Sequence, residues 1–563
     1  MSFGRSARAN GETLLPIEVG QKTLPHQVVT LAFLSDQISA DLISEQLARS
    51  LCVETKASVV LVRLEPLADE NRAGNGARSE PFLNGEFHMP AEVRQTEAGF
   101  HFITLGVRSD PPTPAGIASL VDQLSRHFRY VLIEAHAGAS PAPWLTELLL
   151  RSSAAYLFAT ATAENVRRLT PVMREARARC PGGGVHVKPI GCLAAGESSD
   201  GFDLLAQRAG IPVHWFVHDT PFCGDETKPG FPTGTPGLFQ ADIRRMAREV
   251  GGRLLGLALS SGAAKGFAHV GVIQVLEENG IEVDVVAGAS MGAYVGALWA
   301  HGCDGGELER LSRELERRWA LWSLIDPAFP PRRGFLRGLA VKKRLMRTIG
   351  ESSFADLARP LRVVAANLAT LERVVFSSGE VAAAVHASIA VPGICVPITI
   401  DGEVYTDGGI VDPLPVDVLR EMGVAHVIAV NVIPTPDRIR SGIQQELELA
   451  RRNGANPRKL FRKILPLDQH VNYFARGNLL EILMRSVHGA QIRMAEASCQ
   501  QADLVVRPDI YDDRWVDYRN PGKFIALGRQ AAERQLEEIK SLVAGKEMNH
   551  EQQSAPEPVA AAV

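Results

Sequence analysis

VDVVAGASMGAYVGALWA, residues Val283 to Ala300, sets a serine between two glycines where one apolar run ends and another begins. The run before Gly288 predicts a strand, and the run after Gly292 predicts a helix. The two glycines let the chain turn sharply without a Cβ clash, which leaves the Ser290 hydroxyl at the tip of the turn. This pattern is typical of a serine nucleophile, because the helix N-terminus beside it favours negative charge.

The chain has 563 residues, which is too many for one core, so we expect two folded units. Hydrophobic residues make up 45% and charged residues 22%, which excludes a mainly disordered protein. The formal net charge of −4 gives no general attraction to nucleic acid, and we expect no nucleic-acid partner. The 7 cysteines are scattered without a CxxC spacing, which predicts reduced thiols rather than disulfides or a zinc site.

The N-terminus gives no sign of a targeting segment. Met1 to Lys22 lack the basic and apolar pattern of a signal peptide, and no apolar run of about 18 residues appears elsewhere. We therefore expect a cytoplasmic protein that is soluble or touches a membrane only at its surface.

In the first half of the chain, from Gln27 to about His218, strand-like and helix-like segments alternate. They are Val28–Leu34, Ser39–Ser50, Ala57–Leu64, Phe100–Val107, Pro114–Phe128, Tyr130–Glu134, Pro143–Ser152, Ala155–Thr160, Glu164–Arg179 and Val185–Ile190. Such alternation predicts right-handed βαβ units and a parallel sheet covered on both faces, a Rossmann-like α/β fold. We expect the polar stretch Asp69–Glu97 to be a surface loop.

The order of these elements and the segment Tyr130–Gly138 resemble the deviant P-loop ATPases of the chromosome-partitioning class. The segment Ser35–Ser39 follows the first strand, where that class holds phosphate, but it contains neither a glycine-rich turn nor Gly-Lys-Ser/Thr. Nucleotide binding therefore lacks the backbone N–H groups and the lysine that attract the phosphates. The first unit is thus expected to be a structural or docking domain.

Composition shifts along the chain predict its boundaries. The expected parts are a flexible N-terminal segment 1–25, the Rossmann-like domain 26–222, a linker and lead-in helix 223–250, a second domain 251–545 and a disordered tail 546–563. The linker is indicated by the Pro- and Gly-rich residues 224–237, and the helix by residues 240–250.

A second candidate feature lies before the serine. Residues 253–259 predict a strand, which ends in a loop of small residues, Ser260–Gly266, ahead of a helix over 267–278. Such a loop can turn several backbone N–H groups toward one point, as stabilising an oxyanion requires. The candidate donors are Gly262, Ala263, Lys265 and Gly266.

Four segments resemble the patatin-like phospholipases, in that family's order. They are LALSSGAAKGFAHVG (257–271), GASMG (288–292), Ser388–Gly393, and Asp407-Gly408-Gly409 followed by Pro413-Leu414-Pro415. The resemblance covers about Arg253 to Leu536, and the unit before it further resembles the neuropathy-target-esterase branch. It implies a C-terminal three-layer α/β/α domain preceded by a Rossmann-like, degenerate P-loop-like parallel α/β domain.

The resemblance also implies a Ser–Asp dyad, with Ser290 as nucleophile and Asp407 as the base that takes its proton. Gly408 and Gly409 permit close backbone approach beside that carboxylate. The implied reaction is hydrolysis of carboxylic esters in phospholipids, lysophospholipids or related acyl lipids through an acyl-enzyme, with no metal and no cofactor. The resemblance leaves peripheral membrane contact and oligomeric state open.

Three residues depart from the family. Ser261 and Ala263 stand where glycines are usual, and a Cβ there costs roughly 1–2 kcal/mol if the position requires a left-handed backbone. A weakened oxyanion hole would slow hydrolysis. Asp412 stands where asparagine is common, and like-charge repulsion is expected to raise the pKa of Asp407.

Two alternatives stay open at this stage. One is an α/β-hydrolase with a full triad, whose histidine is His426, His470 or His488, since the chain order Ser, Asp, His is satisfied. The other is a lipid-binding or scaffold protein in which the loop changes have disabled catalysis. We interpret His269, next to the small-residue loop, as a core or surface histidine without a catalytic role.

Two stretches combine features that suit a lipid surface. Residues 317–339 mix arginines with Trp319, Trp322, Phe329 and Phe335, which is typical of an interfacial helix or lid, or of core aromatics. The basic stretch 451–463 is typical of a solvated helix face or of a contact with anionic lipid.

Overall fold

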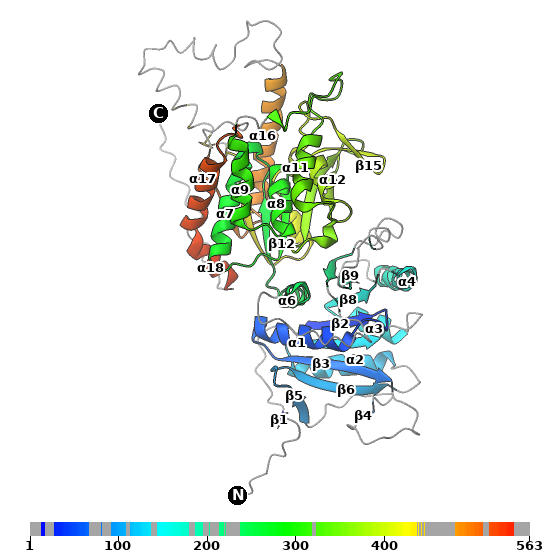
Figure 1. Cartoon of the computed structure of the whole chain (residues 1–563). Helices are drawn as coiled ribbons and strands as arrows, with labels where there is room; N and C mark the ends of the chain where they lie inside the picture. The colour runs from blue at the N-terminus through cyan, green and yellow to red at the C-terminus, as the bar shows by residue number, and fades with distance from the viewer. Residues whose placement is uncertain are drawn as a thin grey trace, which may run out of the picture. The chain divides into compact units, whose positions relative to one another are not determined.

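The computed structural model divides into two compact units, Met1–Gly252 and Arg253–Val563, each with its own sheet (Figure 1). The structure describes residues 13–16, 27–66, 80–81, 92–107, 113–136, 143–160, 162–179, 186–194, 202, 213–218, 220, 237–317, 322–435, 437–438, 441, 444, 479–510 and 517–544. Trp319, the expected linker up to residue 236, the basic stretch 451–463, His470 and the tail 546–563 lie outside these residues.

The first unit is built on a mainly parallel sheet in the order β1-β5-β6-β3-β7-β2-β8-β9-β10, with β4 beside β6. Neighbouring strands from β6 to β10 in this order run parallel to each other, whereas β5 runs antiparallel to both of its neighbours, β1 and β6. The strands are β1 (Thr13–Pro16), β2 (Gln27–Phe33), β3 (Val59–Pro66), β4 (Glu80–Pro81), β5 (Glu92–Gln95), β6 (His101–Val107), β7 (Tyr130–His136), β8 (Ala154–Ala159), β9 (His186–Cys192) and β10 (Trp215–Val217). The expected Rossmann-like α/β class is confirmed.

The helices described in this unit are α1 (Ala40–Thr55), α2 (Pro114–His127), α3 (Pro143–Arg151), α4 (Ala163–Arg179) and α6 (Leu238–Val250). All but α6 lie between strands of the unit in sequence, and α6 follows β10. The central strands β2 and β7 are buried along almost their whole length, as in sheets covered on both faces. Helix α2 begins where Thr113 caps it, with its side chain accepting the Gly116 N–H at 3.1 Å.

Four parts of the first unit differ from expectation. Strand β1 lies in the segment we expected to be flexible, and β4 and β5 lie in the stretch expected to be a loop, where both extend the sheet by pairing with β6. Helix α6, expected to lead into the second unit, instead packs on α1 and β10 of the first. The physical reason is the buried carboxylate of Glu249, which needs polar partners. It accepts hydrogen bonds from Tyr156 at 2.9 Å and Trp215 at 2.7 Å.

The second unit has a mixed sheet in the order β15-β16-β13-β12-β11-β17-β18, with β14 beside β13. Strands β13, β12, β11, β17 and β18 are parallel, and β14, β15 and β16 are antiparallel to their neighbours. The strands are β11 (Leu255–Leu259), β12 (Val285–Ala289), β13 (Leu361–Asn367), β14 (Arg373–Phe376), β15 (Ile398–Ile400), β16 (Glu403–Asp407), β17 (His426–Val430) and β18 (Leu504–Val506).

Helices cover both faces of this sheet. They are α7 (Ala268–Glu278), α8 (Met291–His301), α9 (Gly305–Arg313), α11 (Leu339–Ile349), α12 (Val381–Ser388), α13 (Val416–Glu421), α16 (Leu479–Cys499), α17 (Pro521–Arg534) and α18 (Leu536–Val543), with short 3₁₀ turns η2 (Ala263–Phe267), η3 (Glu314–Glu316), η4 (Phe354–Asp356) and η5 (Gly408–Ile410). From β11 the chain moves through β12 to β13, and later in the opposite direction through β17 to β18. Because crossovers between parallel strands are right-handed, α7 and α8 cover one face and α16 covers the other, where α13 packs against it. The expected three-layer α/β/α domain is confirmed.

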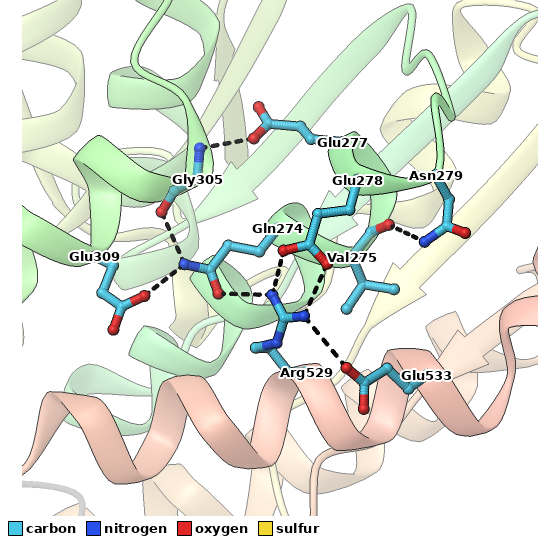
Figure 2. A network of polar contacts seen from close by, with 9 residues as sticks. All are labelled: Gln274, Val275, Glu277, Glu278, Asn279, Gly305, Glu309, Arg529 and Glu533. Atoms are coloured by element: carbon cyan, nitrogen blue, oxygen red, sulfur yellow. Dashed lines mark hydrogen bonds and ion pairs between the residues drawn. The ribbon is translucent and has the colours of Figure 1, made fainter.

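Helices α7 and α17 cross in close contact, and each has a glycine that lies against the backbone of the other. A Cβ built on Gly271 would lie 2.0 Å from the Ile525 carbonyl oxygen, and one on Gly528 would lie 2.0 Å from the Ala268 oxygen. Arg529 then holds the pair together with two hydrogen bonds to Glu278, at 2.7 and 2.8 Å (Figure 2). These contacts fix the position of α7, the helix that follows the small-residue loop in sequence.

The polar network of Figure 2 continues from α7 to α9. The Gln274 side-chain amide donates to the Gly305 carbonyl at 3.0 Å and to Glu309 at 2.7 Å, while Glu277 accepts the Gly305 N–H at 2.7 Å. The bond to Glu277 satisfies a backbone N–H at the start of α9, and all three bonds hold α9 against α7.

Three general findings concern the described residues only. Cys52, Cys303, Cys395 and Cys499 are free thiols. In this part of the chain, no helix combines the length and apolarity that crossing a bilayer requires. The same residues contain no group of His, Cys, Asp and Glu side chains arranged to hold a metal ion.

We predict that Gly528→Ala lowers the unfolding free energy of the second unit by about 2 kcal/mol or more, because the new methyl group overlaps the Ala268 carbonyl. Gly489→Ala is the matched control, since Gly489 lies in α16 with open space around its Cβ position. It should be neutral or slightly stabilising. Calorimetric unfolding measures both variants, and equal melting temperatures would contradict the close contact.

Candidate active site

Ser290 occupies a strained turn between β12 and α8. Its backbone adopts φ 53° and ψ −120°, and helix α8 begins at the next residue. A Cβ on Gly288 would lie 2.6 Å from the Ala293 nitrogen, and one on Gly292 would lie 2.2 Å from the Leu259 oxygen. Both positions therefore require glycine, and the sharp turn predicted from the sequence is present.

Asp407 lies at the end of β16 and is bonded directly to Ser290. The Ser290 hydroxyl donates to Asp407 Oδ2 at 2.6 Å, and the Gly409 N–H donates to Oδ1 at 2.7 Å. A Cβ on Gly408 would lie 2.1 Å from the Val364 oxygen, so this turn also requires glycine. Both carboxylate oxygens are held, and one faces the serine.

Strand β13 brings the two side chains together. It lies between β12 and β16 in the sheet. Val364 is opposite Ala289, the residue before Ser290, and Ala365 is opposite Asp407. Two consecutive residues of one strand thus set the register of both motifs.

Burial of the pair changes its proton chemistry. Burial raises the pKa of Asp407 to about 6, although the hydrogen bonds from Ser290 and Gly409 lower it. The carboxylate is therefore a stronger base than an ordinary aspartate and is still mostly ionised at neutral pH. An acceptor of this kind can take the proton of a hydroxyl without a histidine.

Two further hydroxyl groups orient the site. Ser388, at the end of α12, accepts the Ser290 N–H at 2.8 Å and donates to the Val364 oxygen at 2.6 Å. Thr406 donates to the Ala390 oxygen at 2.6 Å, and the same oxygen accepts the Asp407 N–H. From the sequence, Ser388 stands out only as part of a motif and Thr406 not at all, because a hydroxyl's partners depend on distant strands.

The small-residue loop packs against the serine turn. A Cβ on Gly266 would lie 2.4 Å from Met291 Cγ, and one on Gly262 would lie 2.3 Å from Val432 Cγ2. The Ser261 N–H donates to the Pro413 oxygen at 2.8 Å, which ties the loop to the segment after Asp407. The loop, the serine turn and the aspartate turn are therefore neighbours.

The candidate oxyanion donors differ in how they are bonded. The Lys265 N–H donates to the Gly262 oxygen at 3.1 Å, inside the turn η2. Ala263 is the first residue of η2, so its N–H precedes the internal hydrogen bonds of that turn. This favours Gly262 and Ala263 over Lys265 as donors to a bound oxyanion.

Residues 257–420 match the family model of the patatin-like phospholipases. The second unit contains a patatin-like phospholipase domain.

Two curated relatives extend this finding. Lysophospholipase nte1 of Aspergillus fumigatus is 34% identical over 195 residues, which are 34% of this chain and 13% of that protein. An uncharacterized NTE family protein of Mycobacterium tuberculosis is 38% identical over 177 residues, 31% of this chain and 48% of that protein. The predicted resemblance to the neuropathy-target-esterase (NTE) branch is therefore confirmed. The chain spans less than half the length of either relative.

A solved structure resembles the first unit more distantly. A ParA family ATPase from Chlorobium tepidum matches 34% of this chain and 84% of its own, with 14% identity and a TM-score of 0.25.

The structure shows a different environment for each of the three residues that depart from the family pattern, Ser261, Ala263 and Asp412. Ala263 does adopt a left-handed backbone, with φ 47°, whereas Ser261 is not among the residues with positive φ. The expected effect of Asp412 on Asp407 is wrong, since burial is what raises the pKa of Asp407. The Asp412 carboxylate instead accepts a hydrogen bond from Arg373 at 3.1 Å.

None of the described histidines mediates between the serine and the aspartate of this domain. His426 begins β17 opposite Leu255, about 13 Å along the sheet from the Leu259 end that carries the site. His488 on α16 contacts Gln491 at 3.3 Å. His269 is bonded to the Ser260 oxygen at 2.9 Å, and burial lowers its pKa to about 4, so it is neutral at pH 7.

We predict that Asp407→Asn gains stability relative to the wild type as the pH rises from about 4 to 7. The folded-state pKa of about 6 lies above the ordinary 3.8, so the folded protein binds this proton more tightly, and the Asp407 contribution to stability falls through that window. The difference should be on the order of 3 kcal/mol, from denaturant unfolding at each pH.

Asp509→Asn is the matched control for removal of one charge, because the Asp509 side chain is half exposed and lies 3.9 Å from Arg438. Its difference from the wild type should vary little over the same window. An Asp407→Asn gain that did not depend on pH would contradict the buried, ionising carboxylate.

Proposed function

We propose that the chain hydrolyses carboxylic esters of phospholipids or lysophospholipids, with Ser290 and Asp407 as a catalytic dyad. The observation that carries the proposal is the 2.6 Å hydrogen bond between Ser290 Oγ and Asp407 Oδ2. The patatin-like family and the lysophospholipase name of the fungal relative support an acyl-lipid substrate. Related acyl lipids are the wider substrate class.

In the first half-reaction, Ser290 Oγ attacks the ester carbonyl carbon while Asp407 takes the hydroxyl proton. The tetrahedral intermediate collapses when Asp407 returns that proton to the leaving alkoxide, and the fatty acyl group stays on Ser290. In the second half-reaction, water attacks the acyl carbon and gives its proton to Asp407. The acyl–Oγ bond then breaks as Asp407 returns the proton to Ser290 Oγ. The products are a fatty acid and the deacylated lipid, and the enzyme is regenerated.

The negative oxygen of each intermediate needs donors from the loop. The Ser290 N–H is occupied by Ser388 at 2.8 Å. In this proposal the Gly262 and Ala263 N–H groups are the donors, since they begin the turn that packs beside Ser290. A preformed pair of such donors supplies stabilisation without reorganisation.

The first unit has a separate role in this proposal, as a structural or docking domain. The segment after β2, Ser35–Ser39, has no glycine, and the Ser35 hydroxyl accepts the Gln37 N–H at 3.3 Å. A loop closed on itself by its own side chain does not form the backbone cradle that holds a nucleotide phosphate.

We predict that Ser290→Ala abolishes labelling by a fluorophosphonate and lowers lysophospholipid hydrolysis roughly 1000-fold or more, since no other atom can form the acyl-enzyme. Ser441→Ala, an exposed serine of the same unit, is the control and should label fully. Mass spectrometry of the labelled protein and fatty-acid release report the two effects. Equal labelling of Ser290→Ala and wild type would eliminate Ser290 as the nucleophile.

The second candidate function, a scaffold with disabled catalysis, is favoured by Ala263 at φ 47°. We predict that Ala263→Gly raises turnover severalfold, because a loop relieved of roughly 1–2 kcal/mol of left-handed strain holds its oxyanion donor in place for a larger fraction of the time. Ala264→Gly is the control, as Ala264 lies in the same turn without positive φ, and it should only lose stability. If neither the wild type nor Ala263→Gly hydrolysed short or long acyl esters, the scaffold would be the better conclusion.

A further inference from the structure

Residues 322–338 form a loop, here called the apolar-basic loop, that exposes large hydrophobic side chains to solvent. Phe329 is 89% exposed and Trp322 is 61% exposed, and Ile325 and Phe335 are exposed as well. With Leu339 at the start of α11, this short segment holds half of the exposed large hydrophobic side chains of the described residues. Such a concentration on one surface indicates an interaction site.

The same loop carries positive charge. Arg332, Arg333 and Arg337 are exposed, and among the described residues none of them has an acidic partner within ion-pair distance. The only acidic residue of the loop, Asp326, is occupied, because its carboxylate accepts the N–H groups of Gly338 and Ala340, each at 3.0 Å. The surface is therefore locally basic although the whole chain has a net charge of −4.

The loop is held in this exposed conformation by the protein itself. The N–H groups of Phe335 and Leu336 donate to the Ile394 oxygen at 2.8 and 2.9 Å, and the Val396 N–H donates to the Leu336 oxygen at 2.8 Å. The Arg337 carbonyl is 3.0 Å from His386 Nε2. The aromatic residues are thus presented on a fixed backbone.

The anchors of the loop lead directly to the candidate active site. His386 and Ser388 lie on the same helix, α12, and Ser388 accepts the Ser290 N–H. The segment after α12 contains Ala390, whose oxygen accepts the Asp407 N–H at 3.0 Å, and reaches Ile394 four residues later. A surface that binds the loop would therefore sit against the wall of the catalytic site.

We propose that the apolar-basic loop docks on the surface of an anionic phospholipid bilayer. Trp322, Ile325 and Phe329 enter the boundary between headgroups and acyl chains, and the arginines pair with lipid phosphates. Interleaved aromatic and basic side chains suit this occupant. A second copy of the chain is disfavoured, because two such basic surfaces would repel each other. The inference goes beyond the proposed hydrolysis, since docking requires no chemistry.

The test is co-sedimentation of the full chain with vesicles of phosphatidylcholine alone and with vesicles containing about 30% phosphatidylserine. The Ser290→Ala background prevents turnover of the lipid. We expect stronger binding to the anionic vesicles, and at least a tenfold loss of partitioning for Trp322→Glu with Phe329→Glu, because insertion of the two rings is lost. Arg332→Gln with Arg333→Gln should weaken binding to anionic vesicles by roughly fivefold for each charge removed.

Val53→Glu is the matched control, since Val53 is an exposed apolar residue of the first unit, and its binding should equal that of the parent. Unchanged binding of Trp322→Glu with Phe329→Glu would overturn the proposal. So would a dimer in light scattering without vesicles that this double variant dissociates, because a second copy would then be the occupant. Vesicle binding, together with a failure of the wild-type chain to react with the fluorophosphonate at Ser290, would leave docking intact and remove only the hydrolase proposal.

Discussion

The hydrogen bond between Ser290 and Asp407 depends on β13. This strand lies between β12, which leads to Ser290, and β16, which ends at Asp407. The two residues are 117 positions apart in the chain. The pairing of Val364 with Ala289 and of Ala365 with Asp407 sets both motifs at one end of the sheet. A shift of one residue in either pairing would turn one of the two side chains to the opposite face.

Close packing around that bond accounts for most of the glycines in the motifs. Gly288, Gly292, Gly408 and Gly266 each lie where a Cβ would come within 2.6 Å of another atom. Three of these contacts involve backbone atoms, which cannot rotate away as a side chain can. Ala263 is the exception in the loop, because its methyl group is accommodated in a left-handed backbone that glycine would adopt without strain.

Prediction from the sequence succeeded where local pattern carries the information. The alternating segments of the first unit and the turn at Ser290 follow from apolar periodicity and glycine spacing, and the three-layer second domain follows from the resemblance of four motifs to the patatin-like phospholipases. Strand β5 and the packing of α6 did not follow. Strand β5 is a short strand in a polar stretch, paired between β1 and β6, and α6 is bound to the first unit by the partners of Glu249, which come from β8 and β10. The role of Ser388 was missed for the same reason, since its partners are brought to it by other elements.

The sequence by itself determined which residues can form a sharp serine turn, a loop of small residues and a flexible aspartate turn, because each depends on neighbours only a few positions away. Only the tertiary structure decided that Asp407 is buried against Ser290, that Asp412 turns to Arg373 instead, and that the aromatic residues of 322–338 face solvent. Burial, pKa and exposure are properties of surroundings assembled from distant segments, and no local pattern contains them.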